Sequence, residues 1–191
     1  GKTYDVDSPN RVSVGLLPLV MQALQNIYTK GIVSFSFSLE DDRFFVTVEE
    51  ADERYRVPVG FGPPEYTELD FHGEPHRIGT TGRFARDEDG RLVLVFRVSF
   101  LESAGARHVK LYFEPGFSSL EAKFKETPGR PFLEDGLEML TEEIKVHPVL
   151  ASLLGRASQD YINYKIRSAF EPELTASERG GPGLEGPEPD E

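Results

Sequence analysis

The fold of this chain is decided by residues 91–100, which read Arg91-Leu-Val-Leu-Val-Phe-Arg-Val-Ser-Phe100. Apolar residues recur at every second position of this run: Leu92, Leu94, Phe96, Val98 and Phe100. Arg97 and Ser99 fall between them, so the alternate positions are mixed. Successive side chains of a β-strand point to opposite faces of the sheet. The run therefore predicts a strand with one uniformly apolar face that is committed to a core.

Further strands, joined by short turns, are predicted on the C-terminal side of this run. Asp87-Glu-Asp-Gly90 precedes it, and Asp-Gly pairs favour the positive φ angles of tight hairpin turns. Ser103-Ala-Gly105 follows and leads into an alternating run at 108–114, and Pro115-Gly116 then leads into another at 120–125. Because short loops join antiparallel neighbours, this pattern predicts an antiparallel meander.

Similar alternation upstream indicates five more strands. They fall at 33–39, 44–48, 54–59, 66–71 and 78–84, with polar, acidic or Gly/Pro-rich segments between them. The total is about eight, the number at which a sheet commonly curls or closes. We therefore expect an α+β chain that is mainly antiparallel β. Its core is expected to be a curled sheet or barrel-like meander of about eight strands, with one N-terminal helix and a C-terminal helical segment.

The predicted N-terminal helix spans residues 16–29. Its apolar side chains follow i, i+3, i+4 and i+7 spacing, Pro18 falls in the first turn, and Lys30-Gly31 is a typical helix end. Packing on the core is favoured over a membrane-surface helix, because the polar face is not basic. The segment 1–129 is then an antiparallel β domain with this helix inserted.

The remainder of the chain divides into two parts. From Pro131 the apolar spacing is helical, which predicts a helical extension at 130–172 packed on the sheet. Residues 173–191 are acidic and rich in Pro and Gly. Such a composition does not bury enough apolar area to offset chain entropy, so we expect a disordered tail.

Composition excludes several classes of function. The 191-residue chain carries a formal net charge of −12, which argues against nucleic acid as a partner because phosphate binding needs a basic surface. No apolar run is long enough to span a bilayer, so we expect no membrane insertion by this segment. The absence of cysteine excludes disulfides and thiolate metal sites, and it leaves the compartment open.

One group of residues has the composition of a metal site. His72, Glu74 and His76 stand at alternate positions, and two histidines with a carboxylate can hold a divalent metal. Gly73 and Pro75 break the strand that would align the three side chains, and a turn accounts for the same residues. We therefore predict an exposed loop and assign no metal ligand.

No complete set of catalytic residues is recognisable. The chain has no cysteine and no Gly-x-Ser-x-Gly. Ser119-Leu-Glu-Ala-Lys123 has one residue too many for the Ser-x-x-Lys of penicillin-recognising enzymes, and it lies in a predicted strand. Tyr161-Ile-Asn163 matches their Tyr-x-Asn triplet, but packing of Tyr161 against the sheet is the favoured interpretation. We assign no catalytic and no cofactor-binding residue, and we expect no cofactor.

Four short motifs nevertheless occur in a recognisable order. They are Gly1-Lys-Thr-Tyr4, Thr81-Gly-Arg-Phe84, Leu120-Glu-Ala-Lys-Phe124 and Thr127-Pro-Gly129. This order resembles the C-terminal β-rich, lipocalin-like region of β-lactamase-related and penicillin-binding-protein-like serine hydrolases, beginning at the junction after their catalytic domain. The resemblance covers about residues 1–129. The family's Ser-x-x-Lys, Tyr-x-Asn and Lys-Thr-Gly motifs are then expected upstream of this chain.

The resemblance implies a non-catalytic accessory domain that braces an upstream catalytic domain or shapes access to it. The parent would be a serine hydrolase of the β-lactamase or D-alanyl-D-alanine carboxypeptidase kind, extracytoplasmic, and its catalytic domain would be the partner. This chain itself is then not an enzyme. Two alternatives stay open. One is a lipocalin-like cup that binds a small apolar ligand between Phe-rich inner faces. The other is a structural module that docks a partner through Phe45, Val93 and Val95 on the outer faces.

Overall fold

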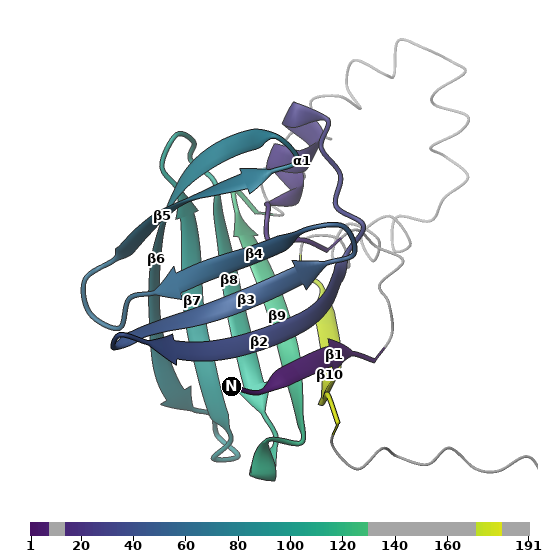
Figure 1. The fold of residues 1–191 in the computed structure, drawn as a ribbon, viewed down its shortest axis with the longest axis vertical. Coiled ribbons are helices and arrows are strands. Elements are labelled where there is room, and N and C mark those ends of the chain that lie inside the picture. Colours follow the sequence, from purple (N-terminus) through teal and green to yellow (C-terminus); the bar gives the residue numbers. More distant parts are fainter. Residues whose placement is uncertain (8–13, 130–170, 181–191) are drawn as a thin grey trace, which may run out of the picture.

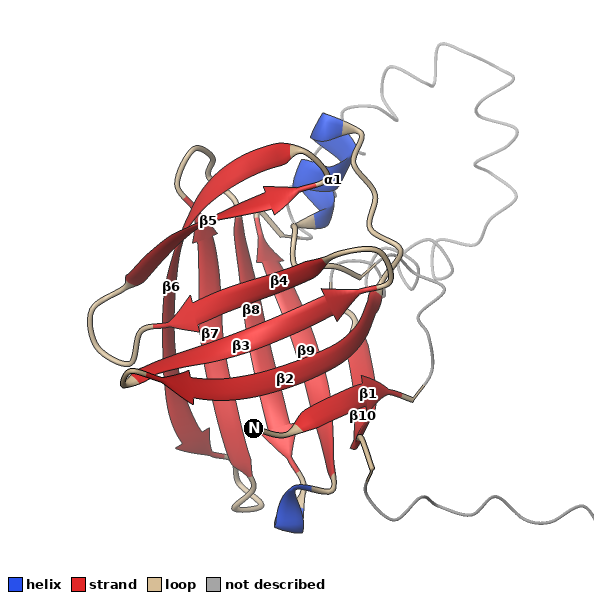
Figure 2. Cartoon of the chain, in the orientation of Figure 1, coloured by secondary structure: helices blue, strands red, loops and turns tan. Residues whose placement is uncertain are grey.

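The computed structural model describes residues 1–7, 14–129 and 171–180, which form one sheet of ten antiparallel strands (Figure 1). The strands are β1 Thr3–Val6, β2 Ile32–Glu40, β3 Arg43–Glu50, β4 Arg54–Val59, β5 Glu65–Phe71, β6 Glu74–Arg86, β7 Leu92–Phe100, β8 Ala106–Phe113, β9 Ser119–Thr127 and β10 Glu173–Glu178. Their order is β4-β3-β2-β1-β10-β9-β8-β7-β6-β5. Figure 2 shows β2–β4 crossing in front of β6–β9, so the sheet curls into a nearly closed barrel.

All the predicted strands form, but the predicted count of about eight was too low because β1 and β10 complete the sheet. These two strands pair with each other, with Tyr4 opposite Glu178. β1 also pairs with β2, and β10 with β9, so they join the two halves of the barrel. The segment 173–191 was predicted to be disordered, yet its first six residues are β10. The predicted helical extension at 130–172 lies outside the described residues, except at its very end.

Alternation along the strands sorts side chains as the run 91–100 predicts. Leu94, Phe96 and Val98 of β7 are completely or almost completely buried, whereas Arg97 between them is exposed. The same alternation buries Val109 and Leu111 on β8. Because each strand contributes inward apolar side chains, the barrel interior is a packed core rather than a channel. The apolar face predicted for this meander is confirmed.

The predicted helix at 16–29 is much shorter in the structure. α1 spans Leu19–Gln25, and Asn26, with a φ of 56°, follows it in the left-handed conformation that commonly ends a helix. Leu16 and Leu17 are buried but precede the helix, so their apolar character reflects contact with the barrel and not helical periodicity. Within the described ranges, no helix is long and apolar enough to cross a membrane.

α1 lies across one end of the barrel, and a buried ion pair fixes its first turn (Figure 1). The Glu126 carboxylate accepts hydrogen bonds from the N–H groups of Leu19 at 2.8 Å and Val20 at 3.4 Å. Negative charge is favourable at a helix N-terminus. Arg107 donates to Glu126 at 2.7 Å and, through two nitrogens, to the carbonyl of Gly15 at 2.7 and 3.0 Å. The chain that leads into α1 is therefore tied to β8 and β9.

A second buried carboxylate, that of Glu50 on β3, fixes the two ends of the α1 segment. It accepts a hydrogen bond from the N–H of Leu16 at 2.8 Å and another from the hydroxyl of Thr29. Gln22 adds a bond from its side-chain amide to the carbonyl of Leu17 at 2.7 Å. Glu50 and Gln22 thus find buried partners along the α1 segment, which covers this end of the barrel.

The side of the barrel has a seam between β4 and β5, the two ends of the sheet order. Just after β4, a single parallel bridge joins Gly60 to Thr81 of β6, beyond β5, and the N–H of Gly82 donates to the carbonyl of Gly60 at 2.8 Å. Nearer to α1, the rings of Tyr55 and Phe71 lie 4.5 Å apart across the same seam. Side-chain packing and one bridge therefore close the barrel where a full ladder is missing.

Candidate functional site: the open end of the barrel

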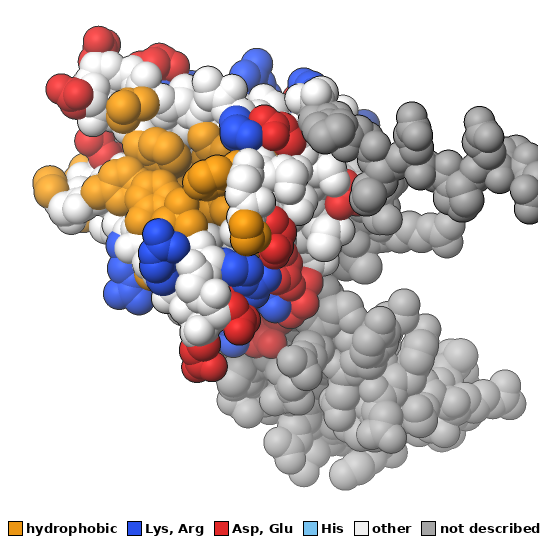
Figure 3. All heavy atoms as spheres, turned by 90° about the horizontal axis from the view of Figure 1, so that it is seen from below, with side chains coloured by type: hydrophobic (Ala, Val, Ile, Leu, Met, Phe, Trp, Pro, Cys, Tyr) orange, Lys and Arg blue, Asp and Glu red, His pale blue; other side chains and the backbone are white. Residues whose placement is uncertain are grey.

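The end of the barrel opposite α1 is open and apolar. Figure 3 views the molecule from that side and shows hydrophobic side chains gathered in one patch. Within the patch, a hollow of about 460 Å³ is lined mainly by side chains of β2, β3, β6, β7 and β8. Two of its lining residues, Leu39 and Phe84, are 69% and 46% exposed. Contiguous exposed apolar surface of this kind commonly marks a binding site. We call this space the mouth hollow.

Aromatic rings from three strands form the inner wall of the mouth hollow. The Phe37 ring of β2 stacks on that of Phe44 of β3 at a centroid distance of 6.2 Å. It also meets the ring of Phe113 on β8 edge-on at 5.5 Å. Deeper residues such as Phe35 and Leu111 are fully buried, so core side chains fill the interior beyond the hollow. The site is a cup at the mouth and not a channel.

The rim carries a second group of rings, which spans the seam. Phe61 lies in the connection between β4 and β5, and its ring is 5.4 Å from Phe44 and 5.3 Å from Phe84. Phe61 is 48% exposed. Aromatic pairs at these separations add stability beyond the area that they bury. This contact continues the aromatic surface of the hollow outward to the loop.

The turn between β8 and β9 contributes Phe117 in an unusual conformation. Its φ is 59°, and it follows Gly116 at 81°. A bulky residue in the left-handed region costs on the order of 1–3 kcal/mol, and such residues cluster at functional sites. The Phe117 ring lies 5.7 Å from that of Phe113 and is 42% exposed. The turn therefore holds an aromatic ring partly in solvent at the edge of the hollow.

Polar groups at the mouth are largely paired with one another. The carbonyl of Phe117 accepts hydrogen bonds from the Tyr4 hydroxyl at 3.0 Å and the Lys2 ammonium at 3.3 Å. Lys2 also pairs with Glu178 at 2.7 Å. Burial, and then the Glu178 carboxylate, raise the pKa of Tyr4 to about 12, so its hydroxyl stays protonated at neutral pH. The mouth hollow therefore presents mostly hydrocarbon to a bound molecule.

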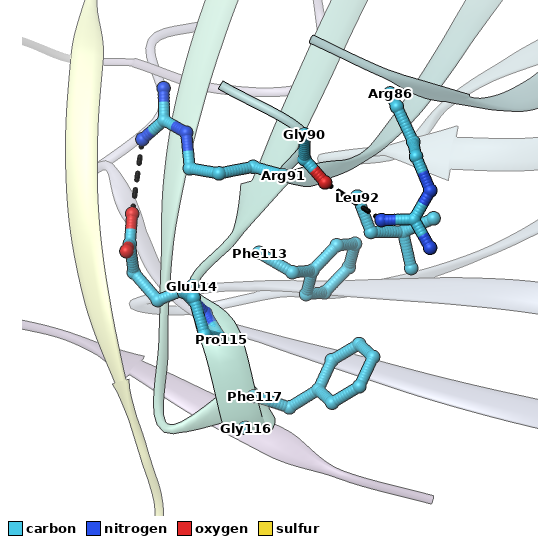
Figure 4. Close-up of a pocket in the computed structure, with 9 residues that line it drawn as sticks. All are labelled: Arg86, Gly90, Arg91, Leu92, Phe113, Glu114, Pro115, Gly116 and Phe117. Atoms are coloured by element: carbon cyan, nitrogen blue, oxygen red, sulfur yellow. Dashed lines mark hydrogen bonds and ion pairs between the residues drawn. The ribbon is translucent and has the colours of Figure 1, made fainter. Parts of the chain in front are cut away.

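A smaller hollow of about 250 Å³, the side hollow, adjoins the mouth hollow (Figure 4). The two share Leu92, Phe113 and Phe117. On one side of the side hollow, Arg91 is paired with Glu114 at 3.0 Å. On the other side lies Arg86. An apolar space thus leads into one that is flanked by guanidinium groups.

The residues considered for a metal site do not come together. His72 stands in the turn between β5 and β6, with its Nδ1 3.3 Å from a Glu53 oxygen. His76 is instead 7% exposed, and its ring meets that of Phe71 at 5.7 Å. The loop predicted here is thus correct for His72, but His76 belongs to the buried face of β6. In the part of the chain that the structure describes, no three ligating side chains are arranged to hold a metal ion.

The serine and lysine considered for catalysis both lie on β9. Lys123 pairs with Glu121 at 2.9 Å and with Glu173 at 3.6 Å, so its ammonium is engaged with neighbouring carboxylates. Ser119 begins the same strand. Tyr161-Ile-Asn163 lies outside the described residues. In the part of the chain that the structure describes, Ser119 and Lys123 are therefore four residues apart along one strand and not one helical turn apart.

The outer-face residues considered for docking are largely covered. Val93 is 4% exposed and Phe45 is 8% exposed, while Val95 is intermediate. The guanidinium carbon of Arg56 lies 3.6 Å from the centroid of the Phe45 ring, and that of Arg43 lies 5.3 Å from it. Phe45 and Val93 therefore offer little exposed apolar surface for docking.

Sequence reasoning did not single out the residues that form the rim. Phe61 and Phe117 lie in Gly/Pro-rich connections, where the alternating pattern says nothing about burial. The usable signal is a large aromatic residue inside a turn, since a turn by itself offers no core to bury it.

Comparisons with known proteins add no assignment, because no protein-family model matches the chain and no curated protein is significantly similar to it. The expected kinship with serine hydrolases therefore stays a prediction.

Proposed function

We propose that this domain is a binding protein that holds a small molecule with an apolar body in the mouth hollow. The observation that carries the proposal is a hollow of about 460 Å³ lined by aromatic rings at the open end of an otherwise filled barrel. Ligand sites usually have volumes of about 300–1,000 Å³ and mainly apolar linings. The size and lining of the hollow both suit a small apolar ligand.

The energetic basis of binding is the removal of exposed apolar side chains from water. Leu39, Phe84 and Phe117 remain 69%, 46% and 42% exposed in the free protein. Covering apolar surface contributes about 25 cal/mol per Å². Because the Phe37 and Phe113 rings are already packed against each other, the inner wall needs little rearrangement to receive a ligand.

Titration with a neutral, environment-sensitive apolar dye tests this proposal. We expect saturable binding at one site, weakened by Phe84→Ser. The matched control is Tyr66→Ser, because Tyr66 is 62% exposed on β5 and does not line the hollow. Dye binding that does not saturate, or that falls equally in both variants, would contradict the proposal.

The second candidate function is that of an accessory domain in a serine hydrolase, and the same exposed rim is what favours it. A catalytic domain seated on Leu39, Phe61 and Phe84 would cover the apolar patch. The test is association with a catalytic domain of that family, measured by sedimentation. Complex formation that Phe84→Ser abolishes and Tyr66→Ser preserves, in a protein that binds no dye, would favour this function over the first.

A further inference from the structure

Strand alternation places Arg86 on the lining side of β6, at the end of the strand. Arg86 and Phe84 are two positions apart and therefore share a face, and Phe84 lines the mouth hollow. In the sheet register, Arg86 stands opposite Leu92, which stands opposite Phe113. Arg86 is thus the one polar member of a row of three paired positions across β6, β7 and β8, with Leu92 and Phe113 as the other two.

The Arg86 guanidinium has few partners. It donates one hydrogen bond, from Nη1 to the carbonyl of Gly90 at 2.7 Å. Among the described residues, no carboxylate is paired with it, and two neighbouring acidic side chains, Asp87 and Glu114, are engaged by Arg91 instead. Arg91 donates to Asp87 at 2.8 Å and to Glu114 at 3.0 Å. Since a guanidinium carries five N–H donors in a fork that suits carboxylates, Arg86 has donors to spare.

Figure 4 shows the guanidinium of Arg86 beside Leu92, above the rings of Phe113 and Phe117. These three apolar residues are the ones that the side hollow shares with the mouth hollow. A molecule that lies across them would have one end at Arg86 and its body among the rings.

We propose that the ligand is an amphipathic monocarboxylate, whose carboxylate binds Arg86 while its hydrocarbon body lies over the shared residues and enters the mouth hollow. This inference rests on the proposed binding function and specifies its ligand class. A cationic head would be repelled by the Arg86 guanidinium, and the Lys2 ammonium at the mouth is already paired with Glu178 at 2.7 Å.

The test compares three ligands with the same chain and different heads: decanoate, decan-1-ol and decylammonium. Each is titrated by calorimetry and, separately, by displacement of the neutral dye. An exposed ion pair contributes up to about 1 kcal/mol, which is roughly a fivefold change in affinity. We expect decanoate to bind about fivefold more tightly than decan-1-ol, and decylammonium to bind most weakly. The preference for decanoate should shrink as salt is added.

Arg86→Gln should remove the preference for decanoate and leave the affinities for the dye and for decan-1-ol unchanged. The control is Arg83→Gln, since Arg83 is exposed on the opposite face of β6 and should not matter. Equal binding of decanoate and decan-1-ol by the parent overturns the carboxylate inference and leaves the binding function intact. Absence of binding by the dye and by all three ligands overturns both. A preference for decanoate that survives Arg86→Gln but is lost in Arg83→Gln would show that Arg83, and not Arg86, binds the carboxylate. That result also overturns the inference.

Discussion

Arg107 and Glu126 form an ion pair of 2.7 Å inside the protein, with side-chain exposures of 1% and 0%. Burial lowers the pKa of Arg107 and raises that of Glu126, and the charge of each partner opposes the shift of the other. The same carboxylate binds the first turn of α1. The buried pair therefore anchors the α1 segment, which covers one end of the barrel, to β8 and β9. The aromatic rings lie exposed at the opposite end.

Removal of one partner from this pair should be strongly destabilising. Arg107→Leu leaves the Glu126 carboxylate buried without its cation, and breaking such a pair costs about 3–5 kcal/mol. Urea denaturation at neutral pH measures the loss. The control is Arg77→Leu, which breaks the 2.5 Å pair with Glu102 on the surface. We expect its midpoint to be unchanged; equal losses in the two variants would contradict the role given to the buried pair.

Glu50 should make stability fall as pH rises. Burial raises its pKa above the ordinary value of 4.5, against the opposing hydrogen bonds from Thr29 and Leu16. Above pH 4.5 the unfolded chain releases this proton before the folded protein does, so the folded state binds more protons. The free energy of unfolding therefore decreases with pH from about that value up to the folded pKa.

Glu50→Gln isolates this contribution. The amide keeps an oxygen for the Leu16 N–H and cannot ionise. The stability of this variant relative to the parent should increase as the pH is raised above 4.5 and then level off. Chemical denaturation across a pH series measures the difference. A difference that is constant with pH, or that decreases, would show that Glu50 ionises at least as readily when buried as when unfolded.

Much of the barrel could be predicted because the alternation that marks a strand is visible in the local sequence. The alternation of Leu94, Phe96 and Val98 with Arg97 is visible in the sequence and needs no knowledge of the neighbouring strands. β10 was missed for the opposite reason. Leu174 and Ala176 alternate with polar residues in a short acidic segment, and they become buried only through pairing with β1 and β9, which are distant in sequence.

The candidate site was only partly predictable. Alternation places Arg86 on the same face as Phe84, but the pattern does not reveal which end of the barrel is open. That depends on where the α1 segment lies, and its position is set by long-range bonds such as that between Arg107 and the Gly15 carbonyl. Leu16 and Leu17 suggested a longer helix because burial by tertiary contact and burial on a helix face give similar apolar spacing.

β10 should contribute to stability as a core strand. Leu174 is 5% exposed, and Leu174→Ala should cost about 2–5 kcal/mol through lost burial and the cavity left behind. Thr175→Ala changes the next residue, which is exposed, and should stay within about 0.5 kcal/mol of the parent. Guanidinium denaturation of both variants measures the contrast. Two equally small effects would mean that β10 is dispensable to the sheet.

The seam should be sensitive to a single added methyl group at Gly82. An ideal Cβ there would lie 2.4 Å from Cγ1 of Val59 and 3.2 Å from the Cβ of Phe96, so the seam would have to open. Overpacking of this kind typically costs about 1–3 kcal/mol, and we expect Gly82→Ala to lose that much in urea denaturation. The control is Gly62→Ala, because an added Cβ at Gly62 meets nothing within 4 Å.

A double variant separates crowding at the seam from the general effect of replacing glycine in a strand. Val59→Ala removes the methyl group that Gly82→Ala would strike, so the two changes together should cost less than the sum of their separate costs. If the two losses of unfolding free energy simply add, the Val59 side chain moves aside at little cost and the seam is not tightly packed at this point. If the double variant loses less stability than the sum of the single losses, by about 0.5 kcal/mol or more, then Gly82 and Val59 are tightly packed against each other. The barrel is then closed by this contact as well as by the neighbouring bridge from Gly60.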